Sequence, residues 1–137
     1  RGDLVKALQL YTQAYAIDHT YADLSFRMGQ IYFKKEDSPR AKKLFEEARD
    51  NDVFIVRATQ DILDLFSDLE KNRHIPVIDT EKILLPEVPD GIMGEPIIED
   101  NVHFSVKGHS LAGLLLAEEI ANRNWIAPID EWHFDRC

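Results

Sequence analysis

Apolar positions in the first third of the chain recur at helical spacing, and the pattern repeats after 34 residues. Each copy holds two small residues, a leucine and an aromatic residue at the same offsets. The matched pairs are Ala7/Ala41, Leu10/Leu44, Tyr11/Phe45 and Ala14/Ala48. We therefore predict helices near residues 4–16, 22–34 and 38–50. Gly29 lies inside the second of them, where glycine costs about 1 kcal/mol relative to alanine, so we expect it to touch a neighbouring helix.

Two further apolar patterns follow. A helix is predicted near residues 56–72, because the spacing of its apolar residues forms one face. These residues are Ala58, Ile62, Leu65, Phe66 and Leu69. The run Ile75-Pro76-Val77-Ile78-Asp79 has the composition of a short buried strand with proline near its start. A last apolar helix is predicted near 107–122, so the order helix, strand, loop, helix indicates an α/β remainder.

The 34-residue period resembles that of the tetratricopeptide repeat. By this resemblance the chain opens with the second helix of one repeat and contains one complete repeat, near residues 22–52. Three residues depart from the repeat pattern. The pattern has a bulky residue where Ser25 stands, and proline where His19 and Val53 stand. Since about three repeats are normally needed to bury a continuous core, we expect these helices to pack on something else. The resemblance implies a concave groove for a protein or peptide partner.

A second resemblance rests on residues 89–112. These residues contain Pro89-Asp90-Gly91-Ile92-Met93-Gly94, then Asp100-Asn101-Val102-His103-Phe104-Ser105-Val106-Lys107-Gly108-His109, and then an apolar helix. The segment resembles the last catalytic block of an SGNH (GDSL-type) ester hydrolase. The resemblance implies that His103 is the general base and that Asp100 orients it. The sequence has no Gly-Asp-Ser block after a strand, so we expect the nucleophile and the oxyanion donors upstream of Arg1, and no turnover from this chain alone.

The bare Asp-x-x-His spacing occurs a second time, at Asp130 and His133. No helix follows this copy, and Trp132 and Phe134 favour a packed C-terminal tail. We therefore interpret Asp130 and His133 as structural. We likewise interpret His109, just after Gly108, as a polar residue at a helix start.

Together these patterns predict a mainly α protein with an α/β remainder, in which tetratricopeptide helix pairs precede the last helix-strand-loop-helix segment of a flavodoxin-like SGNH fold. The predicted domains are residues 1–52 and 53–137. We expect a fragment of a tetratricopeptide-repeat ester hydrolase, or alternatively an interaction module without catalysis. Sheet neighbours for residues 75–79 are missing from the sequence. That segment is therefore expected to be irregular, to pair with the tail at 126–134, or to pair with a second copy and form a homo-oligomer.

Charge and composition narrow the classes of ligand. The net charge of −9 disfavours nucleic acid, whose phosphates would be repelled. No apolar run reaches the roughly 18 residues of a membrane span. The five histidines are scattered, so neither a metal nor another cofactor is expected. Cys137 is the only cysteine, which leaves no internal disulfide, and the localisation stays open because no targeting signal is recognised. A basic cluster is interpreted as the solvated face of the repeat helices, with a ligand groove as the alternative. It comprises Arg27, Lys34, Lys35, Arg40, Lys42 and Lys43.

Overall fold

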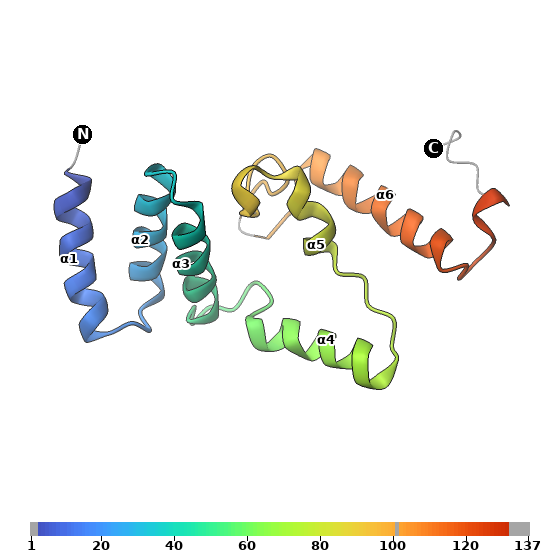
Figure 1. The fold of residues 1–137 in the computed structure, drawn as a ribbon, viewed down its shortest axis with the longest axis horizontal. Coiled ribbons are helices and arrows are strands. Elements are labelled where there is room, and N and C mark those ends of the chain that lie inside the picture. The colour runs from blue at the N-terminus through green and yellow to red at the C-terminus, as the bar shows by residue number, and fades with distance from the viewer. Residues whose placement is uncertain (1–2, 101, 132–137) are drawn as a thin grey trace. The chain divides into compact units, whose positions relative to one another are not determined.

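The computed structural model describes residues 3–100 and 102–131, and this part of the chain is mainly helical (Figure 1). It divides into two compact units. The first runs to Ile75 and includes Asp90–Ile92, and the second comprises Pro76–Pro89 and the residues from Met93 onwards. The α-helices are α1 (Leu4–Ile17), α2 (Ala22–Lys34), α3 (Ser38–Asp50), α4 (Gln60–Arg73), α5 (Thr80–Leu84) and α6 (Val106–Asn122).

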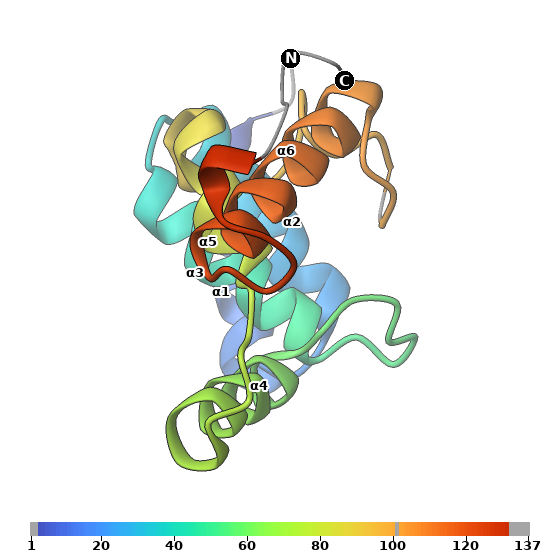
Figure 2. The same cartoon turned by 90° about the vertical axis from the view of Figure 1, so that its right-hand side faces the viewer.

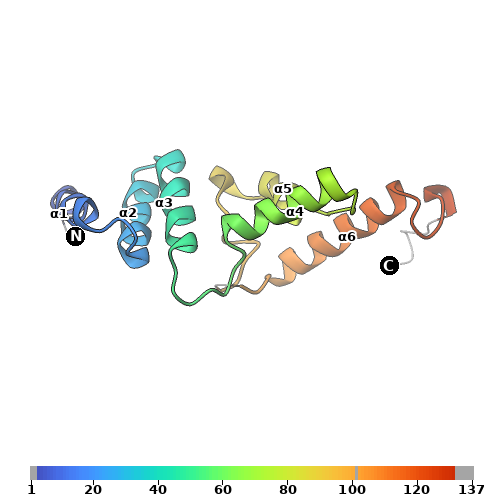
Figure 3. The same cartoon turned by 90° about the horizontal axis from the view of Figure 1, so that it is seen from below.

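In the first unit, α1, α2 and α3 follow one another side by side, as Figures 1 and 3 show. Their bounds agree with the three helices predicted from the 34-residue pattern. Carboxylates begin two of them: Asp3 accepts hydrogen bonds from the first-turn amides of α1, and Asp37 accepts one from the amide of Arg40 in α3. The buried centre of this unit is Leu24, Met28 and Leu44. Half-buried side chains pack against it, namely Leu8, Tyr11, Tyr15 and Tyr32.

Gly29 is buried where α2 meets α3. A Cβ atom at this position would lie 2.8 Å from two ring carbons of Phe45 and 3.3 Å from the carbonyl oxygen of Ala41. The prediction that Gly29 touches a neighbouring helix is therefore confirmed. A side chain at position 29 would require the Phe45 ring to shift within the contact between the two helices.

The fourth helix differs from its prediction. It begins at Gln60 rather than near residue 56, after the N-cap residue Thr59, and Val53–Val56 are exposed and not helical. None of its residues is buried, although its apolar positions form one face. The prediction of a helix is correct, but the described residues do not bury its apolar face.

The predicted buried strand at residues 75–79 is wrong in the described structure. The amide of Ile75 donates to the carbonyl of Leu69 at 3.1 Å and so closes the end of α4, where His74 has a φ of 56°. The carbonyl of Val77 accepts from the Arg123 guanidinium at 3.3 Å. Because the Ile75 amide and the Val77 carbonyl bond a helix end and an arginine side chain, this segment is irregular and not a strand. No strand occurs in residues 3–100 and 102–131, which removes the predicted homo-oligomer through that strand and gives no support to the α/β remainder.

The second unit is built around α5 and α6, which pack against each other (Figure 2). Its buried centre consists of Leu84, Val88 and Ile97. A short 3-10 turn at Leu85–Glu87 follows α5, and the next turn, at Pro89–Gly91, is interrupted by Asp90, which has a φ of 62°. The half-buried side chains around this centre are Leu85, Met93, Ile98, Phe104, Leu111 and Leu115. The loop between the two helices therefore lies on an apolar base, and it carries the candidate site.

Candidate functional site

Asp100 and His103 meet in the loop before α6. One carboxylate oxygen of Asp100, Oδ1, accepts the backbone amides of Val102 and His103, each at 2.8 Å. The other, Oδ2, lies 2.7 Å from Nδ1 of the His103 ring. The two predicted site residues are thus brought together, and a single carboxylate fixes both the backbone turn and the imidazole.

The electrostatics of this contact favour an ionised carboxylate. The amide of Val102, then the amide and the ring of His103, lower the pKa of Asp100 to about 2. An ionised carboxylate is an acceptor only, so Nδ1 of His103 must carry the proton that it donates to Oδ2. The remaining ring nitrogen, Nε2, is then the basic one in a neutral imidazole.

Ser105 ties this loop to the start of α6. Its hydroxyl donates to the Pro96 carbonyl at 2.6 Å and accepts from the Gly108 amide at 3.0 Å, so it caps the helix. Its own amide donates to the Ile97 carbonyl at 2.9 Å. The loop is therefore fastened on both sides of His103.

Two further contacts close the loop. Ile98 and Phe104 form an isolated antiparallel bridge, and the Glu99 amide donates to the His103 carbonyl at 3.0 Å. The Phe104 ring meets the edge of His109 at 5.7 Å between ring centroids. His109 thus packs on the loop, as its interpretation as a polar residue at a helix start allows.

The imidazole of His103 is held in place by Asp100 and stays accessible to solvent. The side chain of His103 is 74% exposed, and no described group is bonded to its Nε2. The hydroxyls of the two serines that follow in the chain are used locally, since Ser105 donates to the Pro96 carbonyl at 2.6 Å and Ser110 donates to the Val106 carbonyl at 2.9 Å. The geometry can accept a proton from a group that approaches Nε2.

Gly108 is a site-forming residue whose role sequence reasoning did not assign. A Cβ atom there would lie 2.2 Å from the carbonyl oxygen of Ile97. Only glycine allows α6 to approach the turn beneath the loop this closely. The signal in the sequence was the spacing from the capping Ser105 to Gly108, but the partner backbone could not be read from it.

The second Asp-x-x-His spacing lies at the end of the described chain. Asp130 lies exposed in a short turn at Ile129–Glu131, and His133 lies outside the described residues. Within the part of the chain that the structure describes, no three metal-binding side chains gather at one place. No helix in that part is long and apolar enough to cross a membrane.

The basic cluster on α2 and α3 is largely exposed and partly neutralised along each helix. Arg27 pairs with Asp23 at 2.7 Å, Arg40 with Asp37 at 3.0 Å, and Lys43 with Glu47 at 3.8 Å. These pairs join residues three or four apart, as on an ordinary solvated helix face. Glu47 also accepts the Tyr15 hydroxyl at 2.8 Å, and this hydrogen bond raises the pKa of Tyr15. The contact links α1 to α3.

Comparison with known proteins supports the first unit only. No curated protein and no solved structure matches the chain. None of the comparisons finds a match to a hydrolase family. The predicted domain boundary between residues 52 and 53 stays a prediction. Residues 1–54 match the family model of the tetratricopeptide repeat, so the prediction of repeat helices in this part of the chain is confirmed.

Proposed function

We propose that this chain combines a tetratricopeptide protein-interaction element with the Asp-His pair of a serine ester hydrolase. The observation that carries the catalytic part is the 2.7 Å contact between Nδ1 of His103 and Oδ2 of Asp100. The second oxygen of the same carboxylate is held by two backbone amides. An orienting carboxylate and an imidazole with its other nitrogen accessible are two of the three members of a Ser-His-Asp site.

In this proposal His103 takes the proton of a serine hydroxyl through Nε2, and then gives it to the leaving group. Asp100 holds the ring and stabilises its charged form. The proposal requires a serine and oxyanion donors that residues 1–137 do not supply. Without them the covalent intermediate cannot form, so residues 1–137 alone give only background turnover.

The repeat helices support the second part of the proposal. The family match over residues 1–54 favours binding of a protein partner by α1, α2 and α3. If the Asp100 loop is only structural, the chain is an interaction module without catalysis. The two possibilities differ in whether the imidazole of His103 is needed for turnover.

The test uses the full-length protein and a short-chain aryl ester as substrate. His103→Ala is expected to lower kcat/KM by roughly 10³ or more, as loss of the base does in such sites. His133→Ala is the matched control, because it removes the histidine of the other Asp-x-x-His spacing, and it should change little. Equal turnover of His103→Ala and the parent would eliminate the catalytic proposal.

Asp100→Asn separates catalysis from structure. The asparagine carbonyl can still accept the amides of Val102 and His103, so the loop is retained. Its NH₂ group, however, faces Nδ1 and favours the tautomer with the proton on Nε2, which cannot act as the base. We expect strongly slowed hydrolysis with an unchanged circular dichroism spectrum. An Asp100→Asn protein that is folded and fully active would leave the loop with a structural role only.

A further inference from the structure

Helix α4 lacks the local cap that begins other helices of the described chain. At α1, α3, α5 and α6 the residue directly before the helix accepts a first-turn amide with its side chain. Thr59 has the backbone geometry of an N-cap residue, with a φ of −75° and a ψ of 169°, but its side chain makes no capping hydrogen bond among the described residues. The first amides of α4 therefore need another acceptor.

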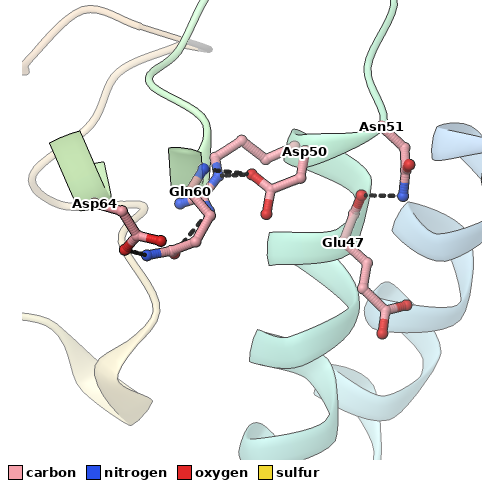
Figure 4. Close-up of polar contacts among 6 residues, drawn as sticks. Glu47, Asp50, Asn51, Gln60 and Asp64 are labelled. Atoms are coloured by element: carbon pink, nitrogen blue, oxygen red, sulfur yellow. Dashed lines mark hydrogen bonds and ion pairs between the residues drawn. The ribbon is translucent and has the colours of Figure 1, made fainter. Parts of the chain in front are cut away.

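A carboxylate of the preceding helix supplies this acceptor. Figure 4 shows Asp50, the last residue of α3, beside Gln60, the first residue of α4. Oδ1 of Asp50 accepts the Gln60 amide at 3.0 Å, although the two residues are ten apart in the sequence. Asp50 thus takes the role for α4 that a cap residue ordinarily takes from the position just before its helix.

Arg49 and Gln60 extend this contact on both sides. Nε of Arg49 donates to Oδ1 of Asp50 at 2.8 Å, and this hydrogen bond lowers the pKa of Asp50, so the acceptor is an ionised carboxylate at neutral pH. The Arg49 side chain is 15% exposed and also donates to Oε1 of Gln60 at 3.3 Å. The Gln60 side chain in turn donates to Asp64 at 2.9 Å. Hydrogen bonds therefore connect the end of α3 to the start of α4.

The helix dipoles explain why an acidic residue lies at this point. A carboxylate is unfavourable at the C-terminus of a helix and favourable at the N-terminus, because the helix ends carry opposite partial charges. Asp50 lies at the C-terminus of α3, where it does not stabilise its own helix, and at the N-terminus of α4, where it does stabilise the next one. The contact with Gln60 gives a physical reason for the acidic side chain.

We propose that Asp50 is the N-cap of α4 and holds closed a hinge formed by residues 51–59. While the contact is made, α4 is attached to the end of α3. When it breaks, α4 opens although α1, α2 and α3 stay folded. Burial supports this separation, since none of the α4 residues is buried among the described residues and Val53–Val56 in the hinge are exposed. A segment with few buried apolar contacts opens at a low cost in free energy.

The test is hydrogen–deuterium exchange of the full-length protein, followed by mass spectrometry of peptides from α4 and from the repeat helices. Asp50→Ala removes the cap, so exchange in α4 should become roughly fivefold faster, with no change in α1 and α2. Asp50→Asn keeps an oxygen that can accept the Gln60 amide but loses the charge, so its effect should be smaller. Equal exchange of α4 in Asp50→Ala and in the parent would overturn the proposal.

Two control variants separate Asp50 from its neighbours. Asp52→Ala removes a carboxylate that accepts the Phe54 amide at 3.0 Å within the hinge, and it should leave exchange in α4 unchanged. Thr59→Ala should also change little, because the Thr59 side chain is not the cap. An effect of Thr59→Ala as large as that of Asp50→Ala would make Thr59 the cap and refute the proposal. Faster exchange of α1, α2 and α4 together in Asp50→Ala would refute the hinge, because it would show a general loss of stability.

Discussion

Two glycines in α6 allow one substitution to be compared in two environments. At Gly113 an added Cβ atom meets nothing within 4 Å, whereas at Gly108 it would lie 2.2 Å from the Ile97 carbonyl oxygen. Alanine is favoured over glycine in a helix interior by about 1 kcal/mol. We therefore expect Gly113→Ala to raise the free energy of unfolding by roughly 0.5–1 kcal/mol.

Gly108→Ala should have the opposite sign. The atom met is backbone, and Ile97 is fully buried, so the carbonyl cannot move aside without shifting α6 from the Leu84 and Val88 side chains. Overpacking of this kind costs about 1–3 kcal/mol. The movement also breaks the hydrogen bond from the Ser105 amide to the Ile97 carbonyl, worth about 1 kcal/mol. After subtraction of the gain in helix propensity, a net loss of about 1–3 kcal/mol remains.

The assay is urea denaturation of both variants and the parent, followed by circular dichroism. Amide NMR shifts of Val102 and His103 report on the loop in the folded state. Gly108→Ala should lower the midpoint and move these shifts, and Gly113→Ala should raise the midpoint and leave them unchanged. If both variants were equally stabilised, the close approach of α6 to Ile97 would be wrong.

Two other predictions concern single groups. Ser25 is fully buried in α2 and its hydroxyl has no described hydrogen-bond partner, so Ser25→Ala should raise the free energy of unfolding by about 1 kcal/mol, measured by urea denaturation. A loss of stability would instead show that the hydroxyl is bonded. Because the pKa of Asp100 is lowered to about 2, its stabilising contacts should be complete above the ordinary carboxylate pKa of about 4 and disappear as the pH falls from there to about 2. The carboxyl carbon of Asp100, followed by NMR, should titrate near pH 2, and a midpoint near 4 would show that the amide contacts are absent in solution.

Local signals predicted the first unit well. The bounds of α1, α2 and α3 follow from apolar spacing and from caps such as Asp3 and Asp37, which lie within a few residues of what they stabilise. The contact at Gly29 could also be predicted from the sequence. Glycine lowers the stability of a helix interior, so it is expected there only where another group packs closely against the backbone. For Asp100 and His103 the spacing of three residues permits one carboxylate to reach both the backbone and the ring. Their proximity is thus largely a local property.

Other features depend on groups distant in sequence. Position 108 requires glycine because a Cβ atom there would collide with the Ile97 carbonyl, and the Ser105 hydroxyl donates its hydrogen bond to the Pro96 carbonyl. Neither contact could be inferred from helical periodicity. The tie between Tyr15 and Glu47 joins residues of α1 and α3. Pairwise contacts of this kind require the fold, because spacing alone does not identify the second partner.

The differences at α4 and at residues 75–79 have a common physical origin. An apolar pattern indicates which side of a segment gains free energy from burial, but it does not indicate what provides the cover. A strand also needs a neighbour to bond its amides and carbonyls, whereas a helix satisfies its own. No strand occurs among the described residues, so the Ile75 amide bonds the end of α4 and the Val77 carbonyl bonds Arg123. Helix α4 forms, but it leaves Leu65 and Phe66 exposed. A helix with an uncovered apolar face can thus persist as a helix, whereas an unpaired strand cannot persist as a strand.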